Sequence, residues 1–323
     1  SAPGTSALAL VQLAGIHGVA WPVTEALETA LPAAAMFCRP IRAEAQAQAE
    51  AAFDAMIQAA GTLNAIGVEP VALKGGAVYA AAGKAVAWRS MVDADLLVPR
   101  ARMAECLDAL AEAGWTGRDD GRVYRWTWDC YAHPPLVPPG GGFSLELHSR
   151  CSYERRGVLD GLLERAVPGG REGLRAPSPE DRISHLVHQA LLMDRGLPRR
   201  VVRLRDLLDW RMIRRDLSPD LGEVEQRFRR HGQREAFEAF RALAGEVWQE
   251  ADAPEPSPSA RVWAMGALAG MADPGRLERR VMSDNHYGWF ERVARGVNAL
   301  SPKGEAAEEE YAAVNAESGA EYA

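Results

Sequence analysis

Apolar runs interrupted by single charged residues predict three short strands in the first half of the chain. The first, 71–76, stops at two glycines; the second, 92–98, carries two aspartates; the third, 143–148, carries a glutamate between two leucines. Because side chains alternate across a strand, acidic residues two apart project from one face. We therefore expect a small sheet whose buried strands carry a few carboxylates on a shared face.

Helical spacing of apolar residues precedes and follows the first two strands. Two short helices are expected within 7–35, and a longer helix over 41–66 ends at Gly67, where a C-terminal glycine is typical. We expect this segment to pack against the back of the sheet. Residues 99–114 predict an amphipathic helix whose inward side chains are Met103, Cys106, Leu107, Leu110 and Ala111.

The segment between this helix and the third strand contains one further strand pattern. Alternation over 122–131 is typical of a strand, and the loop 133–142, rich in proline and glycine, leads into the third strand. We interpret this loop as a plain turn between strands, and a flap over a ligand is the alternative.

The second half of the chain is predicted to be helical, because strand signals nearly vanish after residue 154. Helices are expected at 155–165, 179–195, 199–215, 220–231, 234–250, 258–271 and 275–298. Ser178 followed by Pro-Glu-Asp is typical of a helix start. The segment after Ser301 lacks periodicity, and we expect it to be disordered.

These patterns predict an α/β (α+β) fold with a small mixed twisted sheet. The expected parts are an N-terminal helical segment, a catalytic core, a C-terminal helical subdomain and an acidic tail, with the boundaries 1–66, 67–152, 153–300 and 301–323. At 323 residues the chain is long enough to bury a large core.

Composition is that of a soluble globular protein, with 47% hydrophobic and 25% charged residues. The net charge is −7, but six glutamates lie in the tail, and −7 + 6 leaves −1 for the rest. A nearly neutral body argues against a nucleic-acid partner. No run of eighteen apolar residues predicts a membrane span, and the first residues lack a basic segment. The four cysteines show no Cys-x-x-Cys spacing, so we expect reduced thiols and a cytoplasmic protein.

Candidate chemistry gathers on the predicted strands. Asp93 and Asp95 place two like charges on one face of a mostly buried strand, which is costly unless a cation lies between them. Carboxylate oxygens suit Mg²⁺ or Mn²⁺, ions that accompany triphosphates. Gly75 and Gly76 allow backbone N–H groups to approach a phosphate where a helix begins. With Glu146 as a third acid, this pattern indicates a nucleotidyl-transfer site.

The order Leu-Lys-Gly at 73–75, Arg-x-x-x-Asp-x-Asp-Leu-Leu-Val at 89–98 and Leu-Glu-Leu-His at 145–148 resembles the uncharacterised bacterial nucleotidyltransferase family. This family is a branch of the DNA polymerase β-like superfamily. The resemblance covers 70–210 and includes the helix start at Ser178, the two histidines of the following helix and an Asp-Leu-Leu segment at 206–208.

This resemblance implies a set of site residues and ligands. Gly75 and Gly76 would hold the triphosphate, Asp93 and Asp95 would bind Mg²⁺ or Mn²⁺, and Glu146 would be the third acid. The substrate would be an NTP, with ATP the first choice, and the acceptor is unidentified. Genes of relatives often lie beside genes for peptide modification or surface polysaccharide, and this association hints at a peptide or a sugar phosphate as the acceptor.

For the function and for two of the site residues, the sequence leaves a second interpretation open. The paired aspartates also occur in metal-dependent glycosyltransferases, and a catalytically silent protein could retain the fold to hold a nucleotide. Lys74 either reaches a phosphate or caps its strand. Arg89 either grips a phosphate through its planar fork or pairs with a site carboxylate.

The histidines and the basic helix are interpreted as follows. His148 shares the face of Glu146, where it either orients a carboxylate or packs in the core. His185 and His188 share a helix face, and packing is the favoured interpretation. The arginines of 199–215 are mostly a solvated helix face, from which Arg203 or Arg205 is the best candidate to face the nucleotide or an anionic substrate.

Overall fold

The computed structural model describes residues 14, 19–30, 35–82, 89, 91, 93–118, 132–152, 157–171, 173–250, 255–271, 290–294 and 297–300. By its internal contacts the chain divides into two units, Ser1–Leu268 and Ala269–Ala323. The first unit contains the sheet and the helices around it, whereas the described part of the second contains the end of one helix and a pair of strands. The finer division of the first unit into subdomains stays a prediction.

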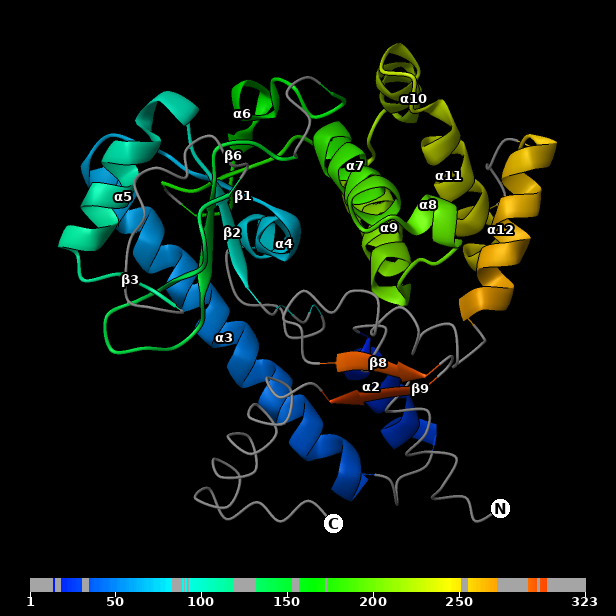
Figure 1. Ribbon diagram of the computed structural model, residues 1–323, viewed down its shortest axis with the longest axis horizontal. Coiled ribbons are helices and arrows are strands. Elements are labelled where there is room, and N and C mark those ends of the chain that lie inside the picture. Colours follow the sequence, from blue (N-terminus) through cyan, green and yellow to red (C-terminus); the bar gives the residue numbers. More distant parts are fainter. Residues whose placement is uncertain are drawn as a thin grey trace. The chain divides into compact units, whose positions relative to one another are not determined.

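A mixed sheet of seven short strands forms the centre of the first unit (Figure 1), as the sequence predicts. Its spatial order is β3-β4-β5-β2-β1-β7-β6, with β2 parallel to β5, β1 parallel to β7 and the other pairs antiparallel. The strands are β1 Val71–Ala72, β2 Ala94–Leu97, β3 Thr116–Gly117, β4 Leu136–Val137, β5 Leu145–His148, β6 Val167–Pro168 and β7 Arg175–Ala176.

Helices pack around this sheet and continue beyond it (Figure 1). Those before β5 are α2 Ala20–Ala30, α3 Ala35–Ala65, α4 Lys74–Ala82, the 3₁₀ turn η2 Arg100–Arg102 and α5 Met103–Glu112. Those after β5 are α6 Leu162–Arg165, α7 Pro179–Val187, the π-helical turn η4 His188–Met193, α8 Gly196–Arg199, α9 Leu204–Leu217, α10 Leu221–Arg230, α11 Arg234–Trp248 and α12 Pro258–Met271.

Helix α3 supplies much of the core behind the strands. Its buried side chains Met56 and Leu63 belong to one apolar cluster with Leu96 of β2 and Leu107 of α5. The helix starts earlier than expected and includes Pro40, and it ends before Gly67, whose φ of 74° is the left-handed geometry of a helix C-terminus. This packing confirms the expected role of the N-terminal segment.

The start of α7 is held by a buried carboxylate. The Ser178 hydroxyl accepts a hydrogen bond from the Asp181 amide at 3.2 Å, which confirms the predicted helix start. The fully buried Asp181 carboxylate accepts hydrogen bonds from Arg165 at 2.7 and 3.0 Å and from Arg227 at 2.6 Å. One acidic side chain therefore joins α6, α7 and α10.

Two of the predicted helices in this region begin late, because left-handed residues intervene. Only 162–165 of the helix expected at 155–165 is helical, since Gly161 has a φ of 71°, and 153–156 lie outside the described residues. The helix expected at 199–215 begins instead at Leu204, because Arg200 has a φ of 51°.

Strands also occur where the sequence predicts none. β6 and β7 extend the main sheet beyond β1, although their two-residue length leaves little alternation to detect. The helix expected at 275–298 is wrong over its described part, where β8 Phe290–Ala294 pairs antiparallel with β9 Val297–Leu300.

The remaining differences are local. Ala111 was expected to face inward but is exposed, whereas the other four predicted inward residues of α5 are buried. The loop 133–142 contains β4, which pairs with both β3 and β5. The strand predicted at 122–131 and the tail 301–323 lie outside the described residues. Among the described helices, none is long and apolar enough to cross a membrane.

We expect Asp181→Ala to lower the free energy of unfolding by about 3–5 kcal/mol, because it leaves two arginines at a buried site without their carboxylate. Urea unfolding followed by circular dichroism measures this loss. The matched control is Asp216→Ala, which removes an exposed pair with Arg215 and should change little. Equal effects of the two substitutions would contradict the role of Asp181.

Candidate active site

The turn from strand to helix comes earlier than predicted: the sequence predicts a strand that runs to the two glycines and a helix beyond them, but both glycines lie in the first turn of α4. β1 ends at Ala72, and α4 begins at Lys74, whose φ of 47° turns the chain sharply. A Cβ atom at Gly75 would lie 2.5 Å from the Met91 sulfur, and one at Gly76 would lie 3.1 Å from the Met56 sulfur. A larger residue at either position would have to displace a methionine side chain, and the two glycines leave the N-terminal amides of α4 uncovered by side chains of their own.

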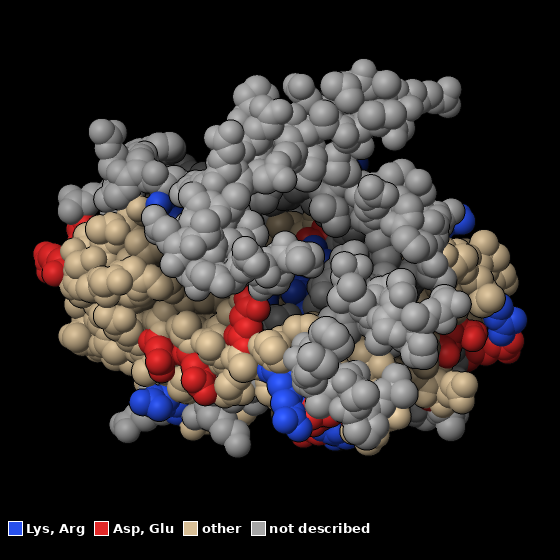
Figure 2. All heavy atoms as spheres, turned by 90° about the horizontal axis from the view of Figure 1, so that it is seen from below, with Lys and Arg blue, Asp and Glu red and all other residues tan. Residues whose placement is uncertain are grey.

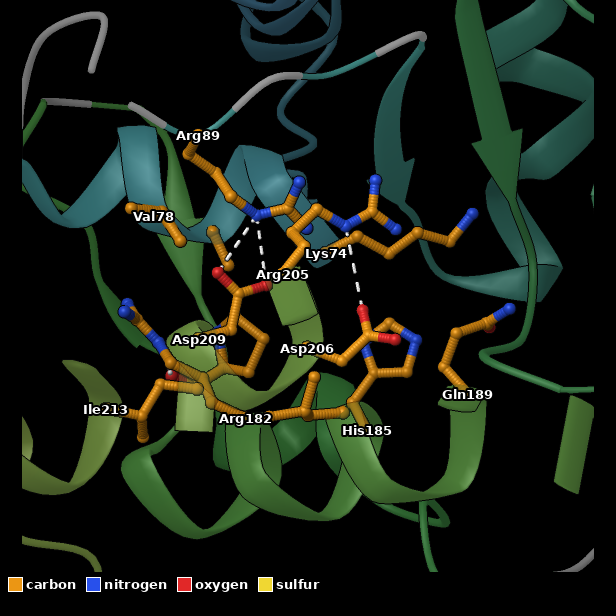
Figure 3. A pocket seen from close by; sticks show the side chains of 13 residues that line it. Lys74, Val78, Arg89, Arg182, His185, Gln189, Arg205, Asp206, Asp209 and Ile213 are labelled. Atoms are coloured by element: carbon orange, nitrogen blue, oxygen red, sulfur yellow. Dashed lines mark hydrogen bonds and ion pairs between the residues drawn. The ribbon is translucent and has the colours of Figure 1, made fainter. Parts of the chain in front are cut away.

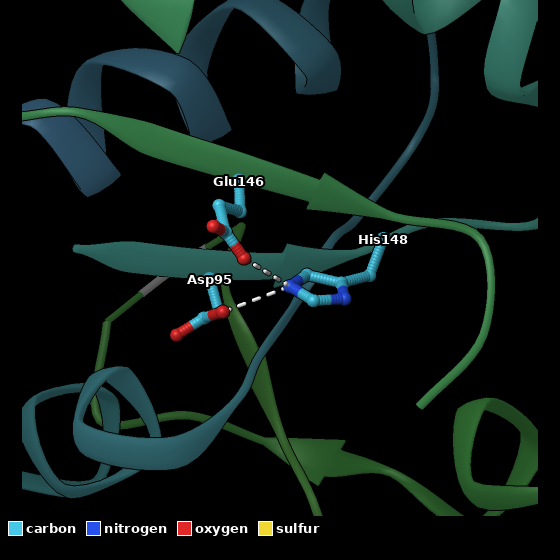
Figure 4. A group of neighbouring side chains, drawn as sticks. All are labelled: Asp95, Glu146 and His148. Carbon is cyan, nitrogen blue, oxygen red and sulfur yellow. Dashed lines mark hydrogen bonds and ion pairs between the residues drawn. The ribbon is translucent and has the colours of Figure 1, made fainter. Parts of the chain in front are cut away.

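The acidic residues of β2 and β5 meet side by side (Figure 4). In the parallel register Asp95 lies opposite Glu146, so both side chains project from the same face. One oxygen of each and a ring nitrogen of His148 all lie within 4.8 Å of one another. His148 Nε2 is 2.8 Å from Asp95 Oδ1 and 3.5 Å from Glu146 Oε2. The expected sharing of one face by Glu146 and His148 is thus confirmed.

Asp95 is the most buried acid of the group, and Lys74 and His148 hold its carboxylate. Its Oδ1 accepts a hydrogen bond from Lys74 Nζ at 2.7 Å as well as the contact from His148. Burial by itself would raise the pKa of Asp95, but Lys74 and His148 lower it below its usual range. Burial by itself would lower the pKa of Lys74 and of His148, yet the neighbouring carboxylates raise both.

Asp93 lies two residues before Asp95 and has the opposite electrostatic character. Burial and the negative charges of Asp95 and Glu146 raise the pKa of Asp93 to about 6, in spite of the opposing effect of Lys74. A carboxyl group near two others of the same charge holds its proton tightly unless a cation is added. This is the electrostatic pattern that the paired aspartates predict.

Arg89 pairs with a carboxylate of the helical region. Its Nε donates to both carboxylate oxygens of Asp209 in α9, at 2.9 and 3.0 Å, and both side chains are buried. Burial shifts the pKa of each partner toward the neutral form, and their mutual attraction opposes that shift. The Tyr79 hydroxyl donates to the Arg89 carbonyl at 2.5 Å, which fixes the backbone here. The phosphate role of Arg89 stays a prediction.

Most of the predicted site residues line a single cavity of about 160 Å³, which we call the acidic cavity. Its lining from the sheet side consists of Lys74, Gly75, Arg89, Met91, Asp93 and Asp95, and from the helical side of Gln189, Asp194, Arg203, Arg205 and Asp206. Gly76 and Glu146 do not line it, although Glu146 is beside Asp95. Figure 2 shows a hollow in one face of the molecule, with Lys and Arg atoms inside it and Asp and Glu atoms at its edge.

A second cavity of about 80 Å³, which we call the helix-side cavity, lies between α4, α7 and α9 (Figure 3). It shares Lys74, Arg89, Gln189, Arg205 and Asp206 with the acidic cavity. His185 lines it and is neutral at physiological pH, because burial lowers its pKa to about 3. His188 is buried as well, in agreement with the packing role expected for the two histidines.

Sequence patterns did not single out three residues of these cavities. Asp209 lies among other charges of α9, and only the fold brings it to Arg89. Arg182 and Gln189 lie on α7 and η4 at positions where any solvated polar residue would fit. Helical spacing places residues 182, 185 and 189 on one face of the helix. This spacing identifies the face but does not indicate which other elements pack against it.

Comparison with known proteins identifies the family. The model of the family described as uncharacterised nucleotidyltransferase matches residues 4–249. The chain belongs to this family of nucleotidyltransferases, and is therefore a transferase enzyme. A second model, described as a putative PD-(D/E)XK phosphodiesterase, matches the short stretch 266–307.

A solution structure of the antibiotic-resistance factor ANT(2'')-Ia is similar to part of the fold. It has 18% sequence identity and a TM-score of 0.37, and the match covers 60% of this chain and 95% of that one. No curated protein matches the sequence.

The raised pKa of Asp93 predicts how the stability of the metal-free protein depends on pH. The folded state raises this pKa from the ordinary 3.8 to about 6, so its contribution is full below about pH 4 and is lost as the pH rises through about 6. With a chelator present, the melting temperature of the wild type should therefore fall relative to that of Asp93→Asn across this range. A constant difference between the two proteins would show that Asp93 titrates normally.

Proposed function

We propose that this protein transfers a nucleoside monophosphate from an NTP to an acceptor and releases pyrophosphate. The observation that carries the proposal is the pairing of Asp95 with Glu146 across β2 and β5, beside Asp93 and the glycine turn of α4. Membership of the nucleotidyltransferase family supports it.

The carboxylates fit a divalent cation such as Mg²⁺ or Mn²⁺. Asp93, Asp95 and Glu146 offer hard oxygen atoms, and the raised pKa of Asp93 marks an excess of negative charge that a cation would relieve. A cation bound there would neutralise the charge of the triphosphate and of the phosphoryl group in transfer.

The chain's own residues bind and orient the reactants in this proposal. In this proposal the backbone amides of Gly75 and Gly76, in the first turn of α4, donate hydrogen bonds to the β- and γ-phosphates. Lys74 directly precedes these amides and lines the acidic cavity with Gly75, and we propose that its ammonium group contributes positive charge on the phosphate side of the site. His148 orients Asp95 through the contact to Oδ1.

Glu146 is the proposed general base. The acceptor oxygen loses its proton to Glu146 and bonds to the α-phosphorus, while the bond from that phosphorus to the bridging oxygen breaks and pyrophosphate leaves. Glu146 is the most accessible acid of its cluster, because its side chain is 22% exposed and those of Asp95 and His148 are 2% exposed. A partly exposed carboxylate can exchange the proton with solvent after each turnover.

ATP is the first nucleotide to test, and the proposed acceptor is a peptide, a protein or a small molecule such as a sugar phosphate. We place the enzyme in the cytoplasm, where nucleoside triphosphates are available. The buried thiols Cys38, Cys106 and Cys151 are free, which agrees with a reducing compartment.

Thermal denaturation with NTP and metal tests nucleotide binding at this site. Mg²⁺ or Mn²⁺ together with an NTP should raise the melting temperature more than either alone, since both bind only the folded state. The Asp93→Asn, Asp95→Asn double variant should lose this joint effect, whereas the control Glu112→Gln, an exposed change on α5, should keep it. Equal shifts in the wild type and the double variant would remove the metal-site proposal.

Glu146→Gln separates transfer from binding, because it keeps the size of the side chain and removes its charge. We expect turnover to fall by about 10²-fold or more, the scale observed when one preorganised electrostatic group is lost. Affinity for a nonhydrolysable NTP, measured by titration calorimetry, should fall only slightly. Incubation with labelled NTP and cell extract, followed by mass spectrometry, identifies an acceptor for the turnover assay. Unchanged turnover in Glu146→Gln would assign the base to another residue.

A further inference from the structure

The helix-side cavity contains more positive than negative charge. Four cationic side chains line it, namely Lys74, Arg89, Arg182 and Arg205, against the two carboxylates Asp206 and Asp209. Its one histidine is neutral because burial lowers the pKa. Lys74 is bonded to Asp95 and Arg89 to Asp209, so the remaining pair of arginines faces the single carboxylate of Asp206.

Arg205 has an unsatisfied hydrogen-bond donor. Its Nε is buried and makes no hydrogen bond to any described residue, and the nearest carboxylate oxygen, Asp206 Oδ1, is 3.6 Å away. This distance is too long for a good hydrogen bond. The Arg205 side chain is 20% exposed, but a buried N–H donor such as its Nε is costly unless an acceptor is supplied, and a guanidinium presents five donors in a planar fork.

Arg182, unlike Arg205, has no acidic partner within the described part of the chain. Its Nε donates to the Pro177 carbonyl at 3.2 Å, and no described carboxylate lies within ion-pair distance of it. Burial alone lowers its pKa to about 10, which leaves the side chain charged at neutral pH. Two arginines from α7 and α9 thus line one small cavity without a full complement of protein acceptors (Figure 3).

We propose that the helix-side cavity binds an oxyanion, a phosphate or carboxylate group, of the acceptor substrate through Arg182 and Arg205. This inference rests on the proposed nucleotidyl transfer and names the acceptor class: a molecule that carries an anionic group besides the nucleophile. Guanidinium groups suit both anions, because their paired N–H groups match two oxygens at once.

The position of the helix-side cavity distinguishes it from the site proposed for the triphosphate, and we therefore assign it to the acceptor. Both cavities contact Lys74, but Gly75 and both aspartates line only the acidic cavity, whereas Ala77 and Val78, further along α4, line only the helix-side cavity. Arg205 lines both cavities, so an anion held there lies next to the reacting groups.

The size and the lining of the cavity describe the part of the acceptor that enters. A volume of about 80 Å³ is several times what one water molecule needs and far below that of a pocket for a whole drug-sized ligand. Apolar side chains, among them Val78, Leu186 and Ile213, form the rest of the wall. The cavity therefore suits one anionic group with a few apolar atoms beside it.

Titration calorimetry with inorganic phosphate tests the assignment. Phosphate is titrated into protein saturated with Mg²⁺ and a nonhydrolysable ATP analogue, so that the triphosphate position is filled. We expect binding to the wild type, at least tenfold weaker binding to Arg182→Gln and Arg205→Gln, and wild-type binding to Arg215→Gln, an exposed change on α9. Arg182→Lys, which keeps the charge, should retain part of the affinity, and melting curves verify that each variant is folded.

The outcomes separate this inference from the proposed function. If the ATP analogue does not bind, the proposed function fails, and phosphate titrated into the free protein still tests the cavity. Phosphate affinity that is equal in the wild type and both glutamine variants would overturn the inference. A parallel loss of phosphate and analogue binding would overturn it too, because the arginines would then serve the triphosphate.

Discussion

The buried carboxylate of Asp95 is the constraint on which the rest of the site depends. A carboxylate at 2% exposure on a central strand is stable only with positive partners, and Lys74 and His148 supply them at 2.7 and 2.8 Å. Lys74 begins α4 directly after β1, and His148 ends β5. The pairing of β1 and β5 on either side of β2 is therefore what assembles the glycine turn, the two aspartates and Glu146 in one place.

A second buried pair connects this arrangement to the helices. Arg89 lies shortly before Asp93, and its bond to Asp209 fixes that segment against α9. Asp209 also lies one helical turn after Asp206 and Arg205, so the same contact positions the arginine shared by the two cavities. The residues proposed for the metal and those proposed for the acceptor are thus held by one network of buried charges.

The sequence predicted the parts of the fold that depend on local periodicity or on acids within apolar strands. The strands around Asp95 and Glu146, the helix start at Ser178 and the end of the long helix before Gly67 are found as expected. β6, β7 and the hairpin of β8 and β9 were missed, because strands of two to five residues are too short to show a clear alternation of apolar and polar positions. β7 in addition depends on β1, a partner about a hundred residues away in the sequence.

The same reasoning explains which side chains of the site were found. A pair of aspartates inside an apolar run is unusual in its own segment, and this local signal identified Asp93 and Asp95 in advance. The sequence around Asp209 and Arg182 shows no unusual pattern. Only the packing of α9 and α7 near α4 brings these two residues to the cavities. Such long-range contacts leave no local pattern.

The central claim is that Asp93, Asp95 and Glu146 together bind a divalent cation with the nucleotide. Anomalous diffraction from crystals grown with Mn²⁺ and a nonhydrolysable ATP analogue tests it most directly. We predict an anomalous peak within coordinating distance, about 2.2 Å, of carboxylate oxygens from these three residues, with the triphosphate against the start of α4. Nucleotide bound with no peak at these carboxylates, or a peak held by other residues, would contradict the account.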